Sequence, residues 1–116
     1  MFNTSFPLIN IKIFFNPTVK QRCREYGLIQ RCLQIPPRNA TSEELLKVHS
    51  PDRIELLQGT DGSPDAEALE ALSSGYDSIY IHPSTANLAL LAAGSTVELV
   101  DAILENKVQN GFALIR

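Results

Sequence analysis

Histidine and cysteine are scarce in this sequence, which holds two of each among 116 residues. Cys23 and Cys32 lack the closely paired spacing of a zinc knuckle, and His49 and His82 are too far apart to be two ligands on one helix face. We interpret the cysteines as free, partly buried thiols of a reducing compartment, with a disulfide or ligand pair as the less favoured alternative. The histidines are interpreted as structural, because no nucleophile motif accompanies them.

Positive charge is also scarce, and it is scattered along the chain. Ten lysines and arginines stand against 13 acidic residues, so the net charge is −3. Direct nucleic-acid binding is excluded, because it requires clustered basic side chains. Asn10 and Lys12 interrupt the apolar patches of residues 1–15, so we predict no membrane span there. Residues 61–65 lack the alternating acids of a calcium loop and are interpreted as a solvated loop.

The composition is otherwise typical of one soluble globular domain. Hydrophobic residues make up 44% of the chain and charged residues 20%. A chain of this length buries roughly two-thirds of the surface that its unfolded form exposes. One hydrophobic core is therefore expected, provided that its apolar faces find partners within the chain.

The first segment differs in composition from the rest of the chain. Residues 1–18 include β-rich pieces such as residues 11–15 and show no helical period. Over residues 19–32 the apolar positions follow one helix face, and Gly27 is placed to end that helix as a C-terminal cap. The positions on that face are Val19, Cys23, Tyr26 and Leu28. We predict a short strand at residues 33–35, before two prolines force an extended turn.

A run of short helices is predicted next. Thr41 and Glu44 have the spacing of a capping box, in which each side chain satisfies a backbone amide at a helix start. Ser50 and Pro51 are a second start signal, as cap and first helical residue, and Gly59 is the stop. A further helix is predicted over residues 66–72, ended by the Ser-Ser-Gly that comes directly after it.

The longest predicted element is a helix from Ser84 or Thr85 to Asn106 with a broad apolar face. A turn at residues 110–111 then leads into the apolar run of residues 112–115, which is the pattern of a strand buried on both faces of a parallel sheet. Such a strand needs a partner on each side, so we expect the sheet to continue beyond this chain. The predicted fold class is α/β, with several short helices, one long helix and a few strands of an incomplete parallel sheet.

Four ordered stretches carry a family resemblance across most of residues 19–116. They are residues 21–28 (QRCREYGL), 38–50 (RNATSEELLKVHS), 76–85 (YDSIYIHPST) and 110–116 (NGFALIR). Together they resemble consecutive landmarks of the class IIb histone deacetylases, nearest the tubulin-deacetylase type. Four landmarks in the right order and spacing are far more specific than any single short motif. Residues 1–18 resemble nothing in that family, so we predict a divergent segment there and the N-terminal part of a deacetylase domain over residues 19–116.

The resemblance implies an arginase-like fold and hydrolysis of acetyl-lysine at a zinc ion. In the family two Asp and one His hold the zinc, a tandem His pair polarises the attacking water, and a Tyr supports the oxyanion. All these positions come after the one that matches Arg116, so we assign no catalytic residue, no metal ligand and no cofactor to this chain. In the family a His-Pro-Glu-Arg-type loop precedes the first helix, and only Pro17 of residues 16–20 matches it.

One binding position is carried over from the resemblance. Ser78 matches the serine that, in this family type, lies at the rim of the active-site tunnel and accepts a hydrogen bond from the backbone amide of the substrate lysine. The alternative is that Ser78 merely begins an extended segment, residues 79–81, whose side chains pack inward.

The sequence therefore predicts a fragment of a zinc-dependent protein lysine deacetylase of the cytoplasm or nucleus, inactive by itself. Its partner would be an acetylated protein, with neither nucleic acid nor membrane involved. The alternative function is a small non-catalytic α/β module that pairs its final strand with another chain or with itself.

Overall fold

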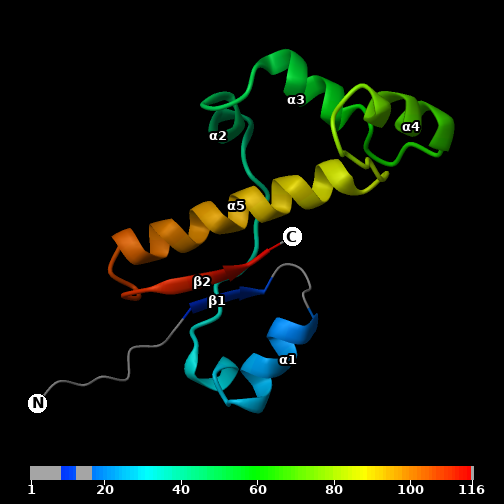
Figure 1. Cartoon of the computed structure of the whole chain (residues 1–116). Coiled ribbons are helices and arrows are strands. Elements are labelled where there is room, and N and C mark those ends of the chain that lie inside the picture. Colours follow the sequence, from blue (N-terminus) through cyan, green and yellow to red (C-terminus); the bar gives the residue numbers. More distant parts are fainter. Residues whose placement is uncertain (1–8, 13–16, 116) are drawn as a thin grey trace, which may run out of the picture. The chain divides into compact units, whose positions relative to one another are not determined.

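The computed structural model describes residues 9–12 and 17–115, which form two compact units (Figure 1). The first unit comprises residues 1–40 and 91–116, and the second comprises residues 41–90. The elements run in the order β1 (Ile9–Lys12), α1 (Pro17–Glu25), a 3-10 turn (Ile29–Arg31), α2 (Ser42–Leu46), α3 (Pro51–Gln58), α4 (Ala66–Ser74), α5 (Thr85–Leu104) and β2 (Gly111–Leu114). The prediction of several short helices, one long helix and parallel strands is confirmed, and of the predicted few strands the described residues form two.

Helix α1 ends at a glycine cap, as the sequence predicted. Gly27 has a φ of 65°, the Gly27 amide bonds to the Arg24 carbonyl at 3.0 Å, and the Leu28 amide bonds to the Cys23 carbonyl at 2.9 Å. This is the Schellman arrangement, which needs a residue without a Cβ at the left-handed position. The predicted face is wrong at Tyr26, which lies beyond the helix end and is 73% exposed. The helix also begins at Pro17, so the predicted segment boundary after Thr18 falls inside it.

Strands β1 and β2 pair in parallel, with Ile9 opposite Gly111 and Lys12 opposite Leu114. Residues 13–15 of the predicted β-rich piece lie outside the described residues. The prediction of a final strand buried on both faces is wrong in this chain, because Phe112 is 58% and Ile115 is 39% exposed. The predicted strand at residues 33–35 is also wrong, since only Gln34 forms an isolated bridge. The prolines after it have no amide hydrogen and cannot extend a ladder.

The core of the first unit lies where α5 meets the segments beside it. Ile35, Leu99, Ala102 and Val108 are buried together, and Leu91, Ile103 and Ala113 pack against them. Helix α5 ends in a second Schellman arrangement, in which Asn106 has a φ of 58° and the Lys107 amide bonds to the Ala102 carbonyl at 3.0 Å. This cap turns the chain from α5 toward β2.

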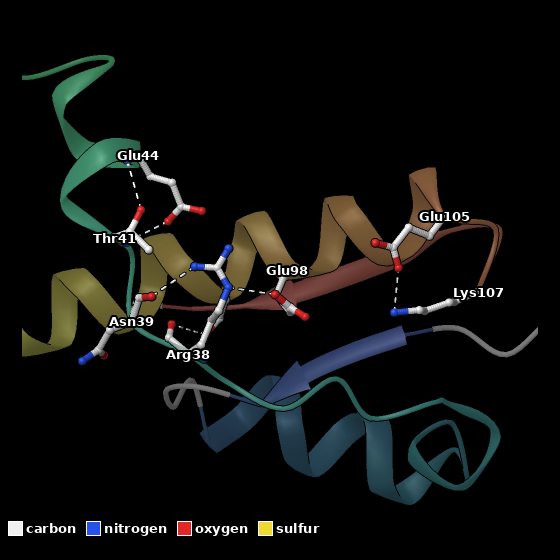
Figure 2. A network of polar contacts seen from close by, with 8 residues as sticks. Arg38, Asn39, Thr41, Glu44, Glu98, Glu105 and Lys107 are labelled. Carbon is white, nitrogen blue, oxygen red and sulfur yellow. Dashed lines mark hydrogen bonds and ion pairs between the residues drawn. The ribbon is translucent and has the colours of Figure 1, made fainter.

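Residues 38–40 cross α5 at unusually close range. The Arg38 amide donates to the Ser95 hydroxyl at 3.1 Å, and that hydroxyl donates to the Arg38 carbonyl at 3.3 Å. Figure 2 shows the Arg38 side chain reaching the Glu98 carboxylate, with 2.8 Å between Nε and Oε2. Ser95 is fully buried, and a Cβ on Gly94 would overlap backbone atoms of residues 38–40. We call this contact the 38–40 crossing.

The second unit begins with three helices, as predicted, and the N-terminal caps of the first two were predicted as well. The Thr41 hydroxyl accepts from the Glu44 amide at 3.2 Å while the Glu44 carboxylate accepts from the Thr41 amide at 2.8 Å, so the capping box is confirmed (Figure 2). Ser50 caps α3, with Pro51 as its first residue, and α3 ends before Gly59. Asp65 caps α4 by accepting from the Ala68 amide at 3.1 Å. Each cap satisfies amides that have no partner inside their own helix.

Helix α4 is two residues longer than predicted, because its serines bond to their own helix. The hydroxyl of Ser73 donates to the Leu69 carbonyl at 2.7 Å, and that of Ser74 donates to the Ala71 carbonyl at 2.8 Å. Serine tolerates the interior of a helix when its hydroxyl bonds back to the preceding turn. The break therefore comes at Gly75, which is the C-cap.

Helix α5 is, among the described residues, the one helix long and apolar enough to cross a membrane by length and composition. The core helix of a soluble protein has the same features. Leu99 and Ala102 of α5 are buried in the core of the first unit, which gives its apolar face a partner inside the chain.

Candidate functional site

The candidate site is the segment between α4 and α5, which contains the predicted binding residue Ser78. Ser73 ties this segment to α4, because its buried hydroxyl accepts from the Ile81 amide at 3.1 Å while donating within the helix. Ile81 is 4% exposed, but Ile79 and Tyr80 are 48% and 80% exposed. The expectation that residues 79–81 pack inward as an extended segment therefore holds for Ile81 alone.

The other end of the segment is tied to α5 and to the loop before α4. The His82 amide donates to the Thr85 hydroxyl at 2.9 Å, and Nδ1 of His82 lies 2.7 Å from the Ser84 hydroxyl. The Pro83 carbonyl accepts from the Gly62 amide at 2.9 Å. The interpretation of His82 as a structural histidine agrees with these bonds. Ser78 and its neighbours therefore form an exposed loop that is anchored on both sides.

Ser78 has a backbone conformation that is rare for a residue with a side chain. Its φ is 55°, in the left-handed region, and its exposed hydroxyl donates to the Asp77 carboxylate at 3.2 Å. Such conformations cost about 1 kcal/mol or more, and they cluster at binding and active sites. Because the hydroxyl hydrogen is used by Asp77, the lone pairs of the Ser78 oxygen are free to accept from a donor outside the loop.

A groove of about 620 Å³ lies between α4 and this loop, and no motif in the sequence pointed to it directly. Leu69, Glu70 and Ser73 line it from α4, and Ile79, Tyr80 and Ile81 line it from the loop. The sequence feature that could have indicated this groove is the excess of acidic residues in the segment that contains it. Residues 41–90 contain nine acidic side chains against two basic ones, Lys47 and Arg53, although the whole chain has a net charge of only −3.

The described residues do not fit the zinc ion that the resemblance implies for the complete domain. No three His, Cys, Asp or Glu side chains come together among residues 9–12 and 17–115. His49 and His82 are both exposed, and His82 is engaged with Ser84. No chemical step through a metal is derived from these residues.

The two cysteines are free and half-buried. The Cys32 thiol donates to the Leu28 carbonyl at 3.0 Å, and the Leu28 amide in turn donates to the Cys23 carbonyl. Burial, and then the neighbouring Cys23, raise the pKa of Cys32 above its ordinary value. A raised pKa lowers the thiolate fraction at neutral pH, so the thiol is a weak nucleophile. These observations agree with the interpretation of the cysteines as free, partly buried thiols.

Comparison with known proteins assigns the family. Residues 16–116 match the model of the histone deacetylase domain. The chain is similar to human polyamine deacetylase HDAC10, at 50% identity over 95 residues, which are 82% of this chain and 14% of that protein. It is similar to histone deacetylase HDA1 of Candida albicans, at 39% identity over 84 residues, which are 72% of this chain and 10% of that protein.

A solved structure agrees on the fold. The HD domain of HDA15 superposes with a TM-score of 0.74 at 23% identity, covering 97% of this chain and 36% of that one. The chain thus spans a small part of its relatives and about a third of that neighbour. The predicted resemblance to class IIb deacetylases is confirmed, although the relatives compared include polyamine deacetylases while the motifs pointed to the tubulin type. This chain belongs to the histone deacetylase family.

Proposed function

We propose that this chain forms the first part of a zinc-dependent domain that removes acetyl groups from lysine side chains of proteins. The observation that carries the proposal is the family match across residues 16–116. In the complete polypeptide zinc would act as a Lewis acid, held by residues that come after this segment. We infer that the chain by itself is inactive, in support of which no three His, Cys, Asp or Glu side chains come together among its described residues. The parent enzyme acts in the nucleus or the cytoplasm.

The exposed hydroxyl of Ser78 favours a protein, rather than a polyamine, as the substrate class. A substrate lysine has a backbone amide, and the Ser78 hydroxyl, exposed on an anchored loop, can accept from it. An acetylated polyamine, the substrate class that the names of the HDAC10 relatives indicate, has no peptide backbone. Ser78 would therefore contribute to binding of the first substrate class and not of the second.

The size and activity of the natural product test the proposal directly. We expect an antibody against residues 42–58 to capture a polypeptide several times larger than 12.8 kDa that releases acetate from acetyl-lysine peptides. Mass spectrometry should find peptides that run past Arg116 into a His-His stretch. We expect the purified 116-residue chain to release no acetate at the same concentration. Deacetylation by the chain alone, retained after zinc chelation, would contradict the proposal.

Replacing Ser78 tests the substrate class. In the captured polypeptide Ser78→Ala should raise KM for acetyl-lysine peptides about two- to tenfold, which corresponds to one lost hydrogen bond of about 0.5–1.5 kcal/mol. KM for an acetylated polyamine should not change. Ser78→Gly removes the same hydroxyl without backbone strain and should give the same result.

The control for Ser78 is Ser42→Ala, because Ser42 is an exposed serine at the start of α2 that does not line the groove. If Ser78→Ala changed KM no more than Ser42→Ala, Ser78 would be a loop residue without a substrate contact. If it raised KM for the polyamine and not for the peptide, the substrate class proposed here would be wrong.

A specific observation favours the alternative function. Phe112 of β2 is 58% exposed, and among the described residues β2 pairs with β1 alone. An apolar strand with an open edge is suited to pairing with another chain. A natural product near 12.8 kDa that co-purifies with a second chain would support this module.

A further inference from the structure

The groove between α4 and the Ser78 loop has the chemistry of a site for a cationic side chain. Its volume of about 620 Å³ lies within the range of about 300–1,000 Å³ that is typical of ligand sites. Its walls are mostly apolar, and Glu70 is the one charged residue among the described residues that line it. No ion-pair partner of Glu70 is found in residues 9–12 and 17–115.

The three serine hydroxyls of the groove wall already take part in hydrogen bonds, that of Ser63 as the acceptor of the Asp65 amide at 3.4 Å. Ser73 uses its hydroxyl for the Leu69 carbonyl and the Ile81 amide, and Ser74 donates to the Ala71 carbonyl. Tyr80, by contrast, is 80% exposed, and it lines the same groove as Glu70. A carboxylate and an aromatic ring over an apolar floor match a lysine or arginine, which carries a charged head on an apolar stem.

We propose that this groove binds a positively charged residue near the acetyl-lysine of a protein substrate, with Glu70 as the residue that selects it. The inference rests on the proposed function and deepens it by naming the sequence context of the substrate. The surrounding charge points to the same partner, because residues 41–90 carry nine acidic and two basic side chains. An acidic peptide would be repelled from this unit.

The position of Ser78 fixes the distance along the substrate. Ile79, the residue directly after Ser78, is part of the groove wall, and consecutive Cα atoms lie about 3.8 Å apart. An extended peptide advances about 3.3 Å per residue. If the amide of the acetyl-lysine bonds to Ser78, a residue a few positions along the peptide would lie at this wall of the groove.

Binding to the 116-residue chain tests the groove independently of catalysis. The probes are three acetyl-lysine peptides that carry Arg, Gln or Glu two residues from the acetyl-lysine, and an acetylated polyamine. In heteronuclear NMR spectra the Arg peptide should shift the amide signals of Glu70, Ile79 and Tyr80 with the highest affinity of the four. The Arg preference should be largely lost at about 1 M salt, because exposed charge pairs are screened there.

Two variants of α4 isolate the selecting carboxylate. Glu70→Gln should lower the affinity for the Arg peptide about two- to fivefold, as expected for the loss of one exposed ion pair. The affinity for the Gln peptide should not change. Glu67→Gln removes the same charge from the same helix outside the groove lining, so it should leave both affinities unchanged. The same ratios should appear in KM when the captured full-length polypeptide is assayed.

Other outcomes have separate meanings. Equal affinity for the Arg and Glu peptides, or equal effects of the two variants, would overturn the groove proposal even if the parent polypeptide is an active deacetylase. If the acetylated polyamine, and none of the peptides, shifted the amide signals of the groove residues, the proposal that the groove binds a peptide would be wrong. A parent polypeptide without deacetylase activity would overturn the proposed function, whereas the NMR affinities would still decide whether the groove selects a cationic peptide.

Discussion

Gly94→Ala should destabilise the first unit by about 3 kcal/mol or more, the upper end of the usual cost of overpacking. The added methyl group would overlap the Arg38 carbonyl oxygen, the Asn39 carbonyl carbon and the Ala40 nitrogen. These are backbone atoms, so no side-chain rotation relieves the overlap, and residues 38–40 must move away from α5. The gain in helix propensity from glycine to alanine, about 1 kcal/mol, offsets only part of the cost.

Urea unfolding followed by circular dichroism measures this effect. Gly75→Ala is the matched control, because a Cβ there would meet its nearest atom, the Leu72 carbonyl oxygen, at an ordinary 3.4 Å and Gly75 is not in the left-handed region. We expect the midpoint to fall sharply for Gly94→Ala and to change little for Gly75→Ala. Equal midpoints for the two variants would show that the close approach of residues 38–40 to α5 is not maintained in solution.

Ser95→Ala should lower the free energy of unfolding by about 1–3 kcal/mol, because it removes the two hydrogen bonds between the Ser95 hydroxyl and the Arg38 backbone. The Ser95 hydroxyl accepts from the Arg38 amide and donates to the Arg38 carbonyl in a position where Ser95 has no exposed surface. The alanine variant takes away the hydroxyl that bonds to both backbone groups of Arg38, and the loss of hydrogen bonds made by a buried side chain is costly.

The comparison for Ser95 is Ser74→Ala on α4, whose hydroxyl makes one exposed bond to its own helix. Ser74→Ala should change the free energy of unfolding by no more than about 0.5 kcal/mol, as is usual for surface positions. Hydrogen exchange of the Arg38 amide provides a second measurement, since its protection should fall in Ser95→Ala and not in Ser74→Ala. If the Ser95→Ala protein were as stable as the Ser74→Ala protein, water would be replacing the Ser95 hydroxyl as the hydrogen-bond partner of the Arg38 backbone.

The 38–40 crossing lies at the start of one landmark of the family resemblance, residues 38–50. The Arg38 guanidinium bonds to Glu98 and to the Asn39 carbonyl, so one side chain fixes the segment that leads from the first unit into α2. With exposures of 31% and 38%, the Arg38 and Glu98 side chains contribute modestly as an ion pair. The larger part of the stability of this contact is expected from Gly94 and Ser95.

Capping was predictable because it is local. Thr41 with Glu44, Ser50 with Pro51 and the glycine at position 27 act within about one helical turn, so their bonds follow from spacing alone. The α4 error was also local. The Ser-Ser pair was interpreted as a break, but each hydroxyl found a carbonyl in the preceding turn, which sequence spacing permits without requiring.

Burial was less predictable because it depends on distant partners. The apolar runs at residues 79–81 and 112–115 indicated two inward-facing strands, yet Tyr80 and Phe112 are exposed in this chain. An apolar residue is buried only where another part of the polypeptide covers it. The relatives are several times longer than this chain, so their remaining parts are candidates to cover Phe112 in the parent polypeptide, whereas the groove proposal requires Tyr80 to stay open to a peptide.

The sequence by itself determined the helix boundaries to within about two residues in most cases, the caps, the family and the position of Ser78 in a loop, because each depends on neighbours along the chain or on ordered motifs. Only the tertiary structure decided that residues 38–40 cross α5 at Gly94 and that Ile79 and Tyr80 line the same groove as Glu70. These pairs lie up to 56 positions apart in the case of Arg38 and Gly94. Contacts of that range arise from packing of whole elements, which no local pattern encodes.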